Sequence, residues 1–326
     1  MQNILVTGAG GFIGSYLVEE LLAEGFHVKG FVHYNSRNNW GKIEELRGER
    51  MRDLEVISGD IRDFDSVYKA MHGCDTVFHL AALIGIPYSY ISPLAYIRTN
   101  IEGSYNVLQA AKEQGVNQLL MTSTSETYGT AQFVPINEDH PLVGQSPYSA
   151  TKIAADQLAI SYYRSFSLPV KIVRPFNTFG PRQSARAIIP AVIIQILEGK
   201  NVIQLGNLHP TRDLCYVKDT VKGFLAVAKS ELLTGHTVNI GTDSEISIGD
   251  LALKIAGLMG ADIKIKGDEK RVRTKDSEVE RLRCDNTKLT SVTGWKPTHS
   301  LEEGLLETIA YIKNHLGEYK SEIYNV

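Results

Sequence analysis

The chain has 326 residues, more than one hydrophobic core usually supports, and its 43% hydrophobic and 22% charged residues are ordinary for a globular enzyme. A net charge of −3 gives no reason to expect nucleic acid or a membrane surface as partner, and no apolar run approaches the roughly 20 residues of a spanning helix. Cys74, Cys215 and Cys284 are too widely spaced for a zinc site or a disulfide framework. We therefore expect a cytoplasmic protein with two domains and no bound metal.

The first predicted strand, residues 4–7, leads into a glycine-rich turn that a helical pattern follows. This order is the one in which a dinucleotide-binding turn occurs. Gly8 permits the tight turn, Gly11 lets the backbone approach a pyrophosphate, and Gly14 lets the helix pack closely on the strand. The helix N-terminus then faces the phosphates. An ordinary glycine turn is the alternative. The candidate cofactor contacts here are Gly8, Gly11, Phe12, Ile13 and Gly14.

The second predicted strand, residues 28–33, ends without the acidic residue that usually binds the adenosine ribose of NAD. Residues 32–37 read Val-His-Tyr-Asn-Ser-Arg instead, so NAD and NADP both stay open. Either His33 or Arg37 faces a 2′-phosphate, or both are solvated loop residues. His33 is kept as a candidate cofactor contact.

The third and fourth predicted strands, residues 54–58 and 76–79, each end beside groups that suit a cofactor. The carboxylate of Asp60 is placed to accept the amino group of adenine. The small residues 80–82 suit a backbone that lies against a cofactor. The further cofactor candidates are Asp60, Ile61, Leu80, Ala81, Ala82, Asn100 and Thr122.

Strands and helices alternate along the rest of this half of the chain. A helix is predicted from Pro93 to about residue 112, because Ser-Pro is a common start signal. Further strands are predicted at residues 116–121, 170–174 and 237–240. The alternation predicts an α/β fold with a doubly wound, Rossmann-like parallel sheet.

The strand at residues 116–121 opens into a row of polar side chains, Thr124, Ser125 and Glu126. Ligands of open α/β sheets bind outside the carboxyl ends of the strands. These three residues are therefore expected to line a site.

Tyr148 and Lys152 are four residues apart on a predicted helix and share one of its faces. An ammonium group beside a phenol, with the positive nicotinamide ring nearby, lowers the phenol pKa from about 10 towards neutrality. Tyr148 is then a candidate general base for a sugar or alcohol hydroxyl. A Tyr and a Lys on a helix surface are the alternative.

These motifs resemble the extended short-chain dehydrogenase/reductase family, and within it the NAD-dependent nucleotide-sugar epimerases and dehydratases. The resemblance implies that NAD is the cofactor, that Thr124 assists the tyrosine and that Lys152 also holds the nicotinamide ribose. It covers nearly the whole chain. The residues that carry it are 8–14, Asp60, 79–82, Thr124, Tyr148, Lys152, 174–177 and 212–219.

The pair Ser125-Glu126 favours a dehydratase. In sugar 4,6-dehydratases of this family Asp-Glu or Ser-Glu follows the threonine, whereas epimerases usually carry small apolar or neutral residues there. Once C4 of the sugar is a ketone, a base must remove the C5 proton and an acid must help the C6 hydroxyl leave. We expect Glu126 to act as the base and Glu126 or Ser125 as the acid; the structural alternative is that Glu126 caps backbone amides. The chain most resembles the UDP-N-acetylglucosamine type, which implies retention at C5.

The resemblance also implies a smaller α+β lobe that binds a nucleotide-diphosphate sugar, UDP-linked by resemblance. Asn177 matches the family asparagine that bonds the diphosphate, and Arg212 and Arg273 match arginines for the diphosphate or the nucleoside ribose. Exposed, solubilising arginines are the alternative. The substrate candidates are Ile84, Tyr88, Thr124, Glu126, Asn177, Arg186, Arg212 and Arg273.

Residues 1–174 plus 217–242 are expected to form the cofactor domain, and residues 175–216 plus 243–326 the lobe. The helices at 93–112 and 148–163 match those that pair across a homodimer in this family. Three other functions stay open: a UDP-glucuronate decarboxylase, for which Arg182 and Arg186 are candidate carboxylate ligands, a 4-epimerase, and a non-catalytic NAD(P) sensor.

Overall fold

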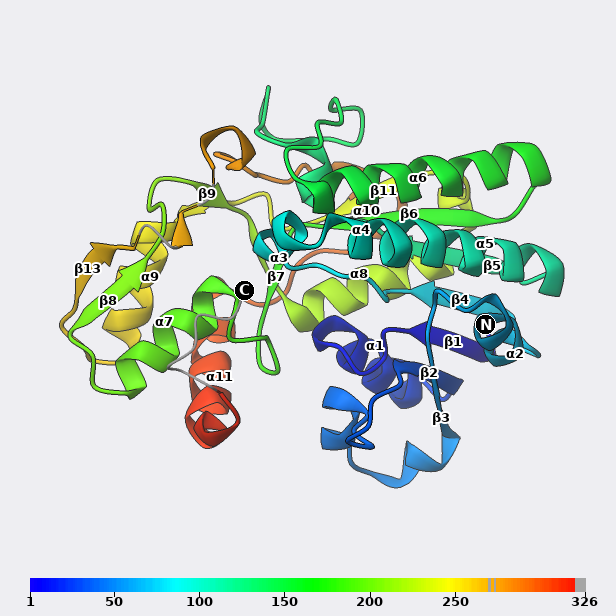
Figure 1. The fold of residues 1–326 in the computed structure, drawn as a ribbon, viewed down its shortest axis with the longest axis horizontal. Coiled ribbons are helices and arrows are strands. Elements are labelled where there is room, and N and C mark those ends of the chain that lie inside the picture. The colour runs from blue at the N-terminus through cyan, green and yellow to red at the C-terminus, as the bar shows by residue number, and fades with distance from the viewer. Residues whose placement is uncertain (269–270, 273, 320–326) are drawn as a thin grey trace.

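The computed structural model describes residues 1–268, 271–272 and 274–319. Its centre is a seven-stranded, entirely parallel sheet in the order β11-β6-β5-β4-β1-β2-β3 (Figure 1). This sheet confirms the predicted α/β fold. Its strands are β1 (Asn3–Thr7), β2 (His27–His33), β3 (Leu54–Gly59), β4 (Thr76–His79), β5 (Gln118–Thr122), β6 (Val170–Pro175) and β11 (Thr237–Ile240).

Helices cover both faces of the sheet, which is why its strands read as nearly continuous apolar runs. Successive side chains of β1 enter different cores: Ile4 and Val6 join one core and Leu5 joins the other. On the first face lie α1 (Phe12–Ala23), α8 (Val217–Lys229) and α10 (Thr287–Thr293), and on the second lie α2 (Phe64–Met71), α5 (Gly103–Gln114) and α6 (Pro147–Phe166).

The strand order creates a switch point between β1 and β4. β1 pairs with β2 on one side and with β4 on the other. At such a point the chain leaves the two neighbouring strands in opposite directions, and a crevice opens at their carboxyl ends. The glycine turn after β1 and residues 80–82 after β4 both lie at this crevice.

The helix predicted from Pro93 to about residue 112 is not uniform. It consists of α4 (Pro93–Tyr96), the π-helical turn η3 (Ile97–Glu102) and α5. The wide turn carries Asn100, whose side chain bonds chain segments outside the helix. Such turns are frequent at functional sites. The short helix α3 (Ile86–Ile91), just before it, was not predicted.

The helix α8 begins at Val217 and contains a buried polar residue, Asp219, in its first turn. The backbone amides of Thr298 and His299 donate to the Asp219 carboxylate, so its burial is satisfied by residues far along the chain.

The smaller lobe packs three helices and short strands around a core of its own (Figure 1). Two short strands of the lobe are separated by Asp213, whose buried carboxylate accepts from the amides of Thr242 and Cys284. The lobe contains α7 (Ile188–Leu197), α9 (Ile248–Leu258) and α11 (Leu301–Asn314), and the strand pairs β7 (Asn177–Phe179) with β10 (Leu214–Tyr216), β8 (Val202–Leu205) with β13 (Lys264–Gly267), and β9 (Thr211–Arg212) with β12 (Ile246–Ser247).

Short 3₁₀ turns complete the structure. They are η1 (Gly41–Glu45), η2 (Glu49–Asp53), η4 (Ser125–Tyr128), η5 (Glu231–Leu233), η7 (Lys275–Ser277) and η8 (Leu316–Glu318). Within the described ranges, none of the helices is both long and apolar enough to cross a membrane.

Candidate active site

The glycine turn after β1 has the close approaches that only glycine allows. Gly8 has a φ of +73°, and a Cβ there would lie 2.8 Å from the Ala81 nitrogen. A Cβ on Gly14 would lie 2.2 Å from the Gly8 carbonyl oxygen. α1 begins at Phe12, so its free amide groups face the turn. This arrangement fits the pyrophosphate of a dinucleotide.

A second segment covers the turn, and the sequence reasoning missed it. A Cβ on Gly10 would lie 2.3 Å from the carbonyl oxygen of Trp40, and the amide of Lys42 donates to the Gly10 carbonyl at 2.9 Å. Gly41 between them has a φ of +75°. The one available signal was the additional glycine at position 10, beyond the three that the dinucleotide pattern needs.

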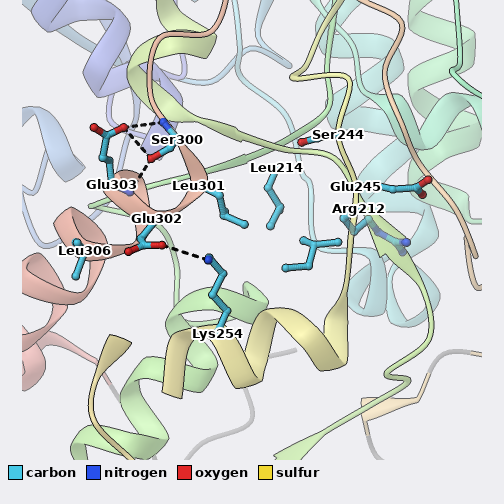
Figure 2. A pocket seen from close by; sticks show the side chains of 11 residues that line it. Arg212, Leu214, Ser244, Glu245, Lys254, Ser300, Leu301, Glu302, Glu303 and Leu306 are labelled. Carbon is cyan, nitrogen blue, oxygen red and sulfur yellow. Dashed lines mark hydrogen bonds and ion pairs between the residues drawn. The ribbon is translucent and has the colours of Figure 1, made fainter. Parts of the chain in front are cut away.

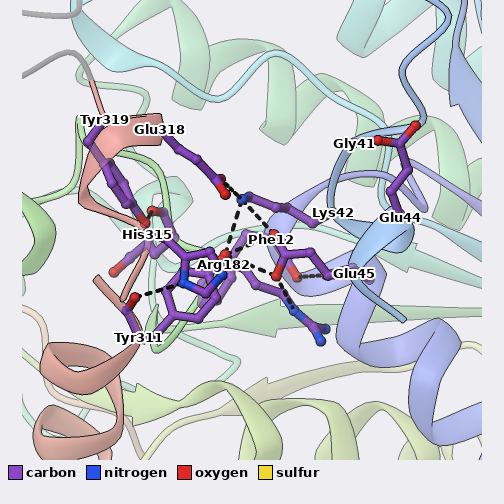
Figure 3. Close-up of polar contacts among 12 residues, drawn as sticks. Phe12, Gly41, Lys42, Glu44, Glu45, Arg182, Tyr311, His315, Glu318 and Tyr319 are labelled. Atoms are coloured by element: carbon purple, nitrogen blue, oxygen red, sulfur yellow. Dashed lines mark hydrogen bonds and ion pairs between the residues drawn. The ribbon is translucent and has the colours of Figure 1, made fainter. Parts of the chain in front are cut away.

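Lys42 ties this segment to the last helix of the smaller lobe (Figure 3). Its Nζ donates to Glu45 at 2.7 Å, to the Tyr311 hydroxyl at 3.1 Å and to Glu318 at 3.0 Å. Burial acts to lower the pKa of Lys42, but these hydrogen bonds outweigh it and raise the pKa. The residues over the glycine turn are therefore held by both parts of the molecule.

Arg182 belongs to the same cluster. Its guanidinium group pairs with Glu19 at 2.8 Å and with Glu45 at 3.4 Å, and it lies 4.3 Å above the Tyr16 ring. The sequence offered Arg182 as a ligand for a sugar carboxylate. In the structure its charge is already matched by two carboxylates, which disfavours that role.

The adenosine candidates gather at the ends of β2 and β3. Both oxygens of Asp60 accept from the Arg62 side chain, and this hydrogen bonding lowers the pKa of Asp60. His33, exposed at the end of β2, adds its charge to that effect. Ile61 is buried against Gly103. A contact between Asp60 and adenine remains a prediction.

The segment after β4 is held from both ends. The hydroxyl of Thr7 bonds the His79 ring at 2.8 Å and accepts from the Ala81 amide at 3.2 Å. The Asn100 amide group bonds the backbone of Leu83 through both its oxygen and its nitrogen, each at 2.9 Å, and also donates to Thr151 at 3.1 Å. Asn100, predicted as a cofactor contact, thus holds the backbone beside residues 80–82.

The polar row after β5 forms the tight turn η4. Thr124 is its N-cap residue, and its hydroxyl accepts from the Glu126 amide at 3.2 Å. The same hydroxyl is hydrogen-bonded to the phenol of Tyr148. Ser125 and Glu126 are buried, with 3% and 9% of their surfaces exposed. The structure therefore brings Thr124, Glu126 and Tyr148 together; their catalytic roles stay predictions.

Lys152 lies beside this group but contacts the backbone. Its Nζ donates to the carbonyl oxygen of Thr122 at 2.6 Å. Burial raises the pKa of Tyr148, the hydrogen bond with Thr124 lowers it, and the charge of Glu126 raises it. The predicted shift towards neutrality is not produced by these residues alone. It requires the further positive charge that the prediction placed on a nicotinamide ring.

The sugar candidates lie around Tyr96, whose ring in turn contacts the ring of Tyr148. The Tyr96 ring is 6.3 Å from the Tyr148 ring and 6.1 Å from the Tyr88 ring. Arg186 Nη1 would lie 3.0 Å from a Cβ on Gly85. Ile84, in the same segment, is 59% exposed. Residues 84–88 and Arg186 thus form one wall, which Tyr96 joins to the Tyr148 ring.

Three buried side-chain oxygens have no hydrogen-bond partner within residues 1–268, 271–272 and 274–319: Thr122 Oγ1, Asn177 Oδ1 and Gln183 Oε1. Buried polar atoms normally have partners. Thr122, the last residue of β5, and Asn177, the first residue of β7, are the predicted cofactor and diphosphate contacts. Together with the glycine turn, these atoms fit a bound dinucleotide and a bound polar substrate.

Arg212 is buried at the edge of the smaller lobe. It pairs with Glu278 at 3.4 Å, and Asn207 donates to the same carboxylate at 3.0 Å. Glu278 is only 8% exposed, and Arg212 and Asn207 supply the partners of its buried carboxylate. Arg273 lies outside the described residues.

Arg212 also lines a cleft of about 580 Å³ between β9, α9 and the start of α11 (Figure 2). Lys254 and Glu302 pair across this cleft at 3.3 Å. The cleft belongs to the smaller lobe, whereas Thr124, Tyr148 and Lys152 lie at the strand ends of the main sheet.

Sequence comparisons relate the chain to a group of sugar-nucleotide enzymes. The profile of the family described as GDP-mannose 4,6 dehydratase matches residues 5–308. The chain is 34% identical to UDP-glucose 4-epimerase of Mycolicibacterium smegmatis (96% of this chain, 99% of that protein) and 32% identical to dTDP-glucose 4,6-dehydratase of Streptomyces griseus (96% and 94%). It is 33% identical to UDP-N-acetyl-alpha-D-glucosaminuronate decarboxylase of Bacillus cytotoxicus (96% and 98%).

Solved structures give the same relationship. The structure of DesIV, a dTDP-glucose 4,6-dehydratase from Streptomyces venezuelae with NAD and TYD bound, matches with a TM-score of 0.89 and 27% identity (98% of this chain, 99% of that chain). A Bacillus cereus UDP-glucuronic acid 4-epimerase variant in complex with NAD and a fluorinated UDP-sugar matches with a TM-score of 0.88 and 30% identity (96% and 100%).

Proposed function

Because this chain belongs to the GDP-mannose 4,6-dehydratase family of NAD-dependent nucleotide-sugar enzymes, we propose that it is a nucleotide-sugar 4,6-dehydratase, with UDP-N-acetylglucosamine as substrate. Its relatives include dehydratases, epimerases and decarboxylases, and several are similarly close. The choice between them therefore rests on the side chains at the reacting centre.

The observation that carries the proposal is the buried carboxylate of Glu126 next to the Tyr148 phenol. A 4-epimerase needs only an acid–base group at the C4 hydroxyl, which Tyr148 with Thr124 supplies. Elimination of water needs a second group that removes the C5 proton. Glu126, one residue beyond Ser125 in the η4 turn, is such a group.

The first step is oxidation at C4. Tyr148, hydrogen-bonded to Thr124, takes the proton of the C4 hydroxyl. Lys152, four residues away on α6, holds a positive charge near the phenol. NAD, held by the glycine turn and Lys152, would supply the hydride acceptor for C4 and the hydride donor for C6.

The second step is loss of water between C5 and C6. The C4 ketone makes the C5 proton acidic, and Glu126 removes it. The C6 hydroxyl departs as water with a proton from Glu126 or Ser125. Glu126, reprotonated through solvent by the proton that Tyr148 releases, then protonates C5 on the face from which the first proton was taken, so configuration at C5 is retained. The product is a 4-keto-6-deoxy sugar.

The substrate is held by the wall around Tyr96 and by the lobe. We assign the hexose to Ile84 and Tyr88, and the diphosphate to Asn177 and Arg212. In support, the Asn177 side chain has a buried, unpartnered oxygen among the described residues. The resemblance to the N-acetylglucosamine type supports a UDP-linked substrate.

The experiment is mass spectrometry of products after incubation of the NAD-loaded protein with UDP-N-acetylglucosamine, UDP-glucuronate, UDP-glucose and dTDP-glucose. Loss of one water from UDP-N-acetylglucosamine supports the proposal. An isomer of unchanged mass identifies an epimerase, and loss of carbon dioxide identifies a decarboxylase. Either result, without dehydration, contradicts the proposal.

We also infer a homodimer in which α5 and α6 pair across the interface. Both helices expose large apolar side chains: Tyr105 is 45%, Tyr163 37% and Phe166 50% exposed. Groups of such side chains favour association. Sedimentation should give twice the chain mass of 36.1 kDa, and a monomer at micromolar concentration would contradict the inference.

A further inference from the structure

Asp156 is a buried carboxylate that the reaction steps above do not use. It lies on α6 one turn after Lys152 and is 3% exposed. Its Oδ2 accepts three hydrogen bonds, from the Ser123 hydroxyl at 2.8 Å and from Arg174 Nε and Nη2 at 3.1 and 2.9 Å. A buried charge with this many partners is fixed in position.

Through Ser123, Asp156 reaches the catalytic end of β5. Ser123 stands between Thr122, whose carbonyl accepts from Lys152 Nζ at 2.6 Å, and Thr124, which bonds the phenol. The Ser123 amide donates to the Val173 carbonyl at 2.7 Å. Both the backbone and the side chain of Ser123 are therefore held. The peptide groups that place Lys152 and Thr124 cannot move independently of it.

The charge of Asp156 also acts on its two cationic neighbours. Burial lowers the pKa of Lys152, and the Asp156 charge opposes this. Burial likewise acts to lower the pKa of Arg174, but the Asp156 charge, the Tyr128 phenol and the hydrogen bonds to both together outweigh it and raise the pKa. Arg174 in turn lies 4.9 Å above the Tyr128 ring. The carboxylate thus stabilises the protonated form of the catalytic lysine.

Other titratable groups also face Lys152 or the phenol beside it. His79 on β4 is buried, and burial lowers its pKa to about 3, so it adds no positive charge near neutral pH. Glu126 on η4, Tyr96 on α4 and Asp156 itself each act to raise the pKa of the neighbouring Tyr148 phenol. Among these groups Asp156 is the one whose charge opposes the effect of burial on Lys152.

We propose that Asp156 is a positioning residue of the hydride-transfer step: through Ser123 it holds residues 122–124 in place, and it fixes a negative charge one helical turn from Lys152. The inference rests on C4 oxidation, the step that the proposed dehydratase shares with epimerases and decarboxylases. The inference can therefore be tested separately from the proposed substrate and product.

The test is the pH profile of single-turnover hydride transfer, followed by the absorbance of the reduced nicotinamide, with whichever nucleotide sugar the wild-type protein oxidises. The variant is Asp156→Asn combined with Arg174→Gln, because Asp156→Asn alone would leave a buried, unpaired guanidinium group. Loss of the carboxylate lets Lys152 lose its proton at lower pH. The alkaline limb of the profile should therefore move to lower pH.

Three variants separate the positioning of residues 122–124 from the effect of the Asp156 charge. Ser123→Ala removes the hydrogen bond to the strand end but keeps the charge, so it should slow the plateau rate about fivefold without moving the limb. Asp156→Glu keeps the negative charge on a longer side chain. It should also leave the pH of the alkaline limb unchanged. Asp262→Asn, an exposed carboxylate of the lobe, should change neither.

A merely structural ion pair would lower the thermal midpoint of the double variant and leave its pH profile unchanged, and that result overturns the proposal. If the double variant does not fold, the plateau rates of hydride transfer in Ser123→Ala and Asp156→Glu test the proposal instead. A wild-type plateau in both overturns the positioning role of Asp156, and a slower plateau with an unmoved limb in both supports it.

Discussion

Replacing Glu126 with Gln separates the two halves of the proposed reaction. The amide has the shape of the carboxylate but cannot accept the C5 proton. A positioned general base contributes about 10²- to 10⁴-fold to rate, or about 3–5 kcal/mol. Because Glu126 is 9% exposed, bulk water has little access to replace it. We expect dehydration to slow by about a thousandfold.

C4 oxidation should survive this change. The negative charge of Glu126 raises the pKa of Tyr148, so its removal lowers that pKa and favours the phenolate. The acidic limb of hydride transfer should therefore move to lower pH than in the wild type. Reduced nicotinamide should accumulate in Glu126→Gln, because the 4-keto sugar is not carried forward.

The assay follows the absorbance of reduced nicotinamide in a single turnover and the release of water by mass spectrometry in the same sample. Glu126→Asp is the control, since it keeps a carboxylate with a shorter reach and should recover part of the dehydration. If Glu126→Gln retains most of the dehydration, Glu126 is not the C5 base. Loss of C4 oxidation as well would place Glu126 in the first step instead.

Further changes test other parts of the structure. Tyr148→Phe should abolish C4 oxidation while NAD binding persists, because the general base is lost and the ring is kept; oxidation at more than a hundredth of the wild-type rate would argue against Tyr148 as the base. Gly14→Ala should destabilise the fold by about 1–3 kcal/mol in urea unfolding and weaken NAD binding in calorimetry, because its Cβ would lie 2.2 Å from the Gly8 carbonyl oxygen. The folded protein holds His79 neutral, with a pKa lowered by burial from 6.5 to about 3, so stability should fall as the pH drops across this window, where the unfolded chain binds the extra proton. His79→Gln should flatten that dependence, by on the order of a few kcal/mol, and an unchanged dependence would show that other groups cause it.

Features carried by short stretches of chain could be predicted from the sequence. The glycine turn is recognised from the spacing of Gly8, Gly11 and Gly14 because each performs a local task in one turn. Tyr148 and Lys152 are paired by the helix period alone. The parallel sheet follows from the alternation of apolar strands with helices. Each of these depends on residues within about one element of one another, where local geometry dominates.

Features that depend on distant partners were decided only by the tertiary structure. The Trp40 carbonyl rests on Gly10, and Lys42 is joined to Tyr311, across 269 positions of sequence. Arg182 pairs with Glu19, and the buried Glu278 pairs with Arg212. In each case a charged or polar group, which a sequence pattern assigns to solvent or to a ligand, finds its partner on a remote segment.

The active site likewise combines groups that the local sequence places with contacts that only packing between distant segments creates. The sequence determines which groups follow β5 and which face of α6 carries the phenol and the ammonium group. It does not determine that Lys152 bonds the Thr122 carbonyl, or that Asp156 and Arg174 form a buried pair behind it. Those contacts arise where β5, β6 and α6 pack together, because burial makes each charge depend on the one partner that packing brings within reach.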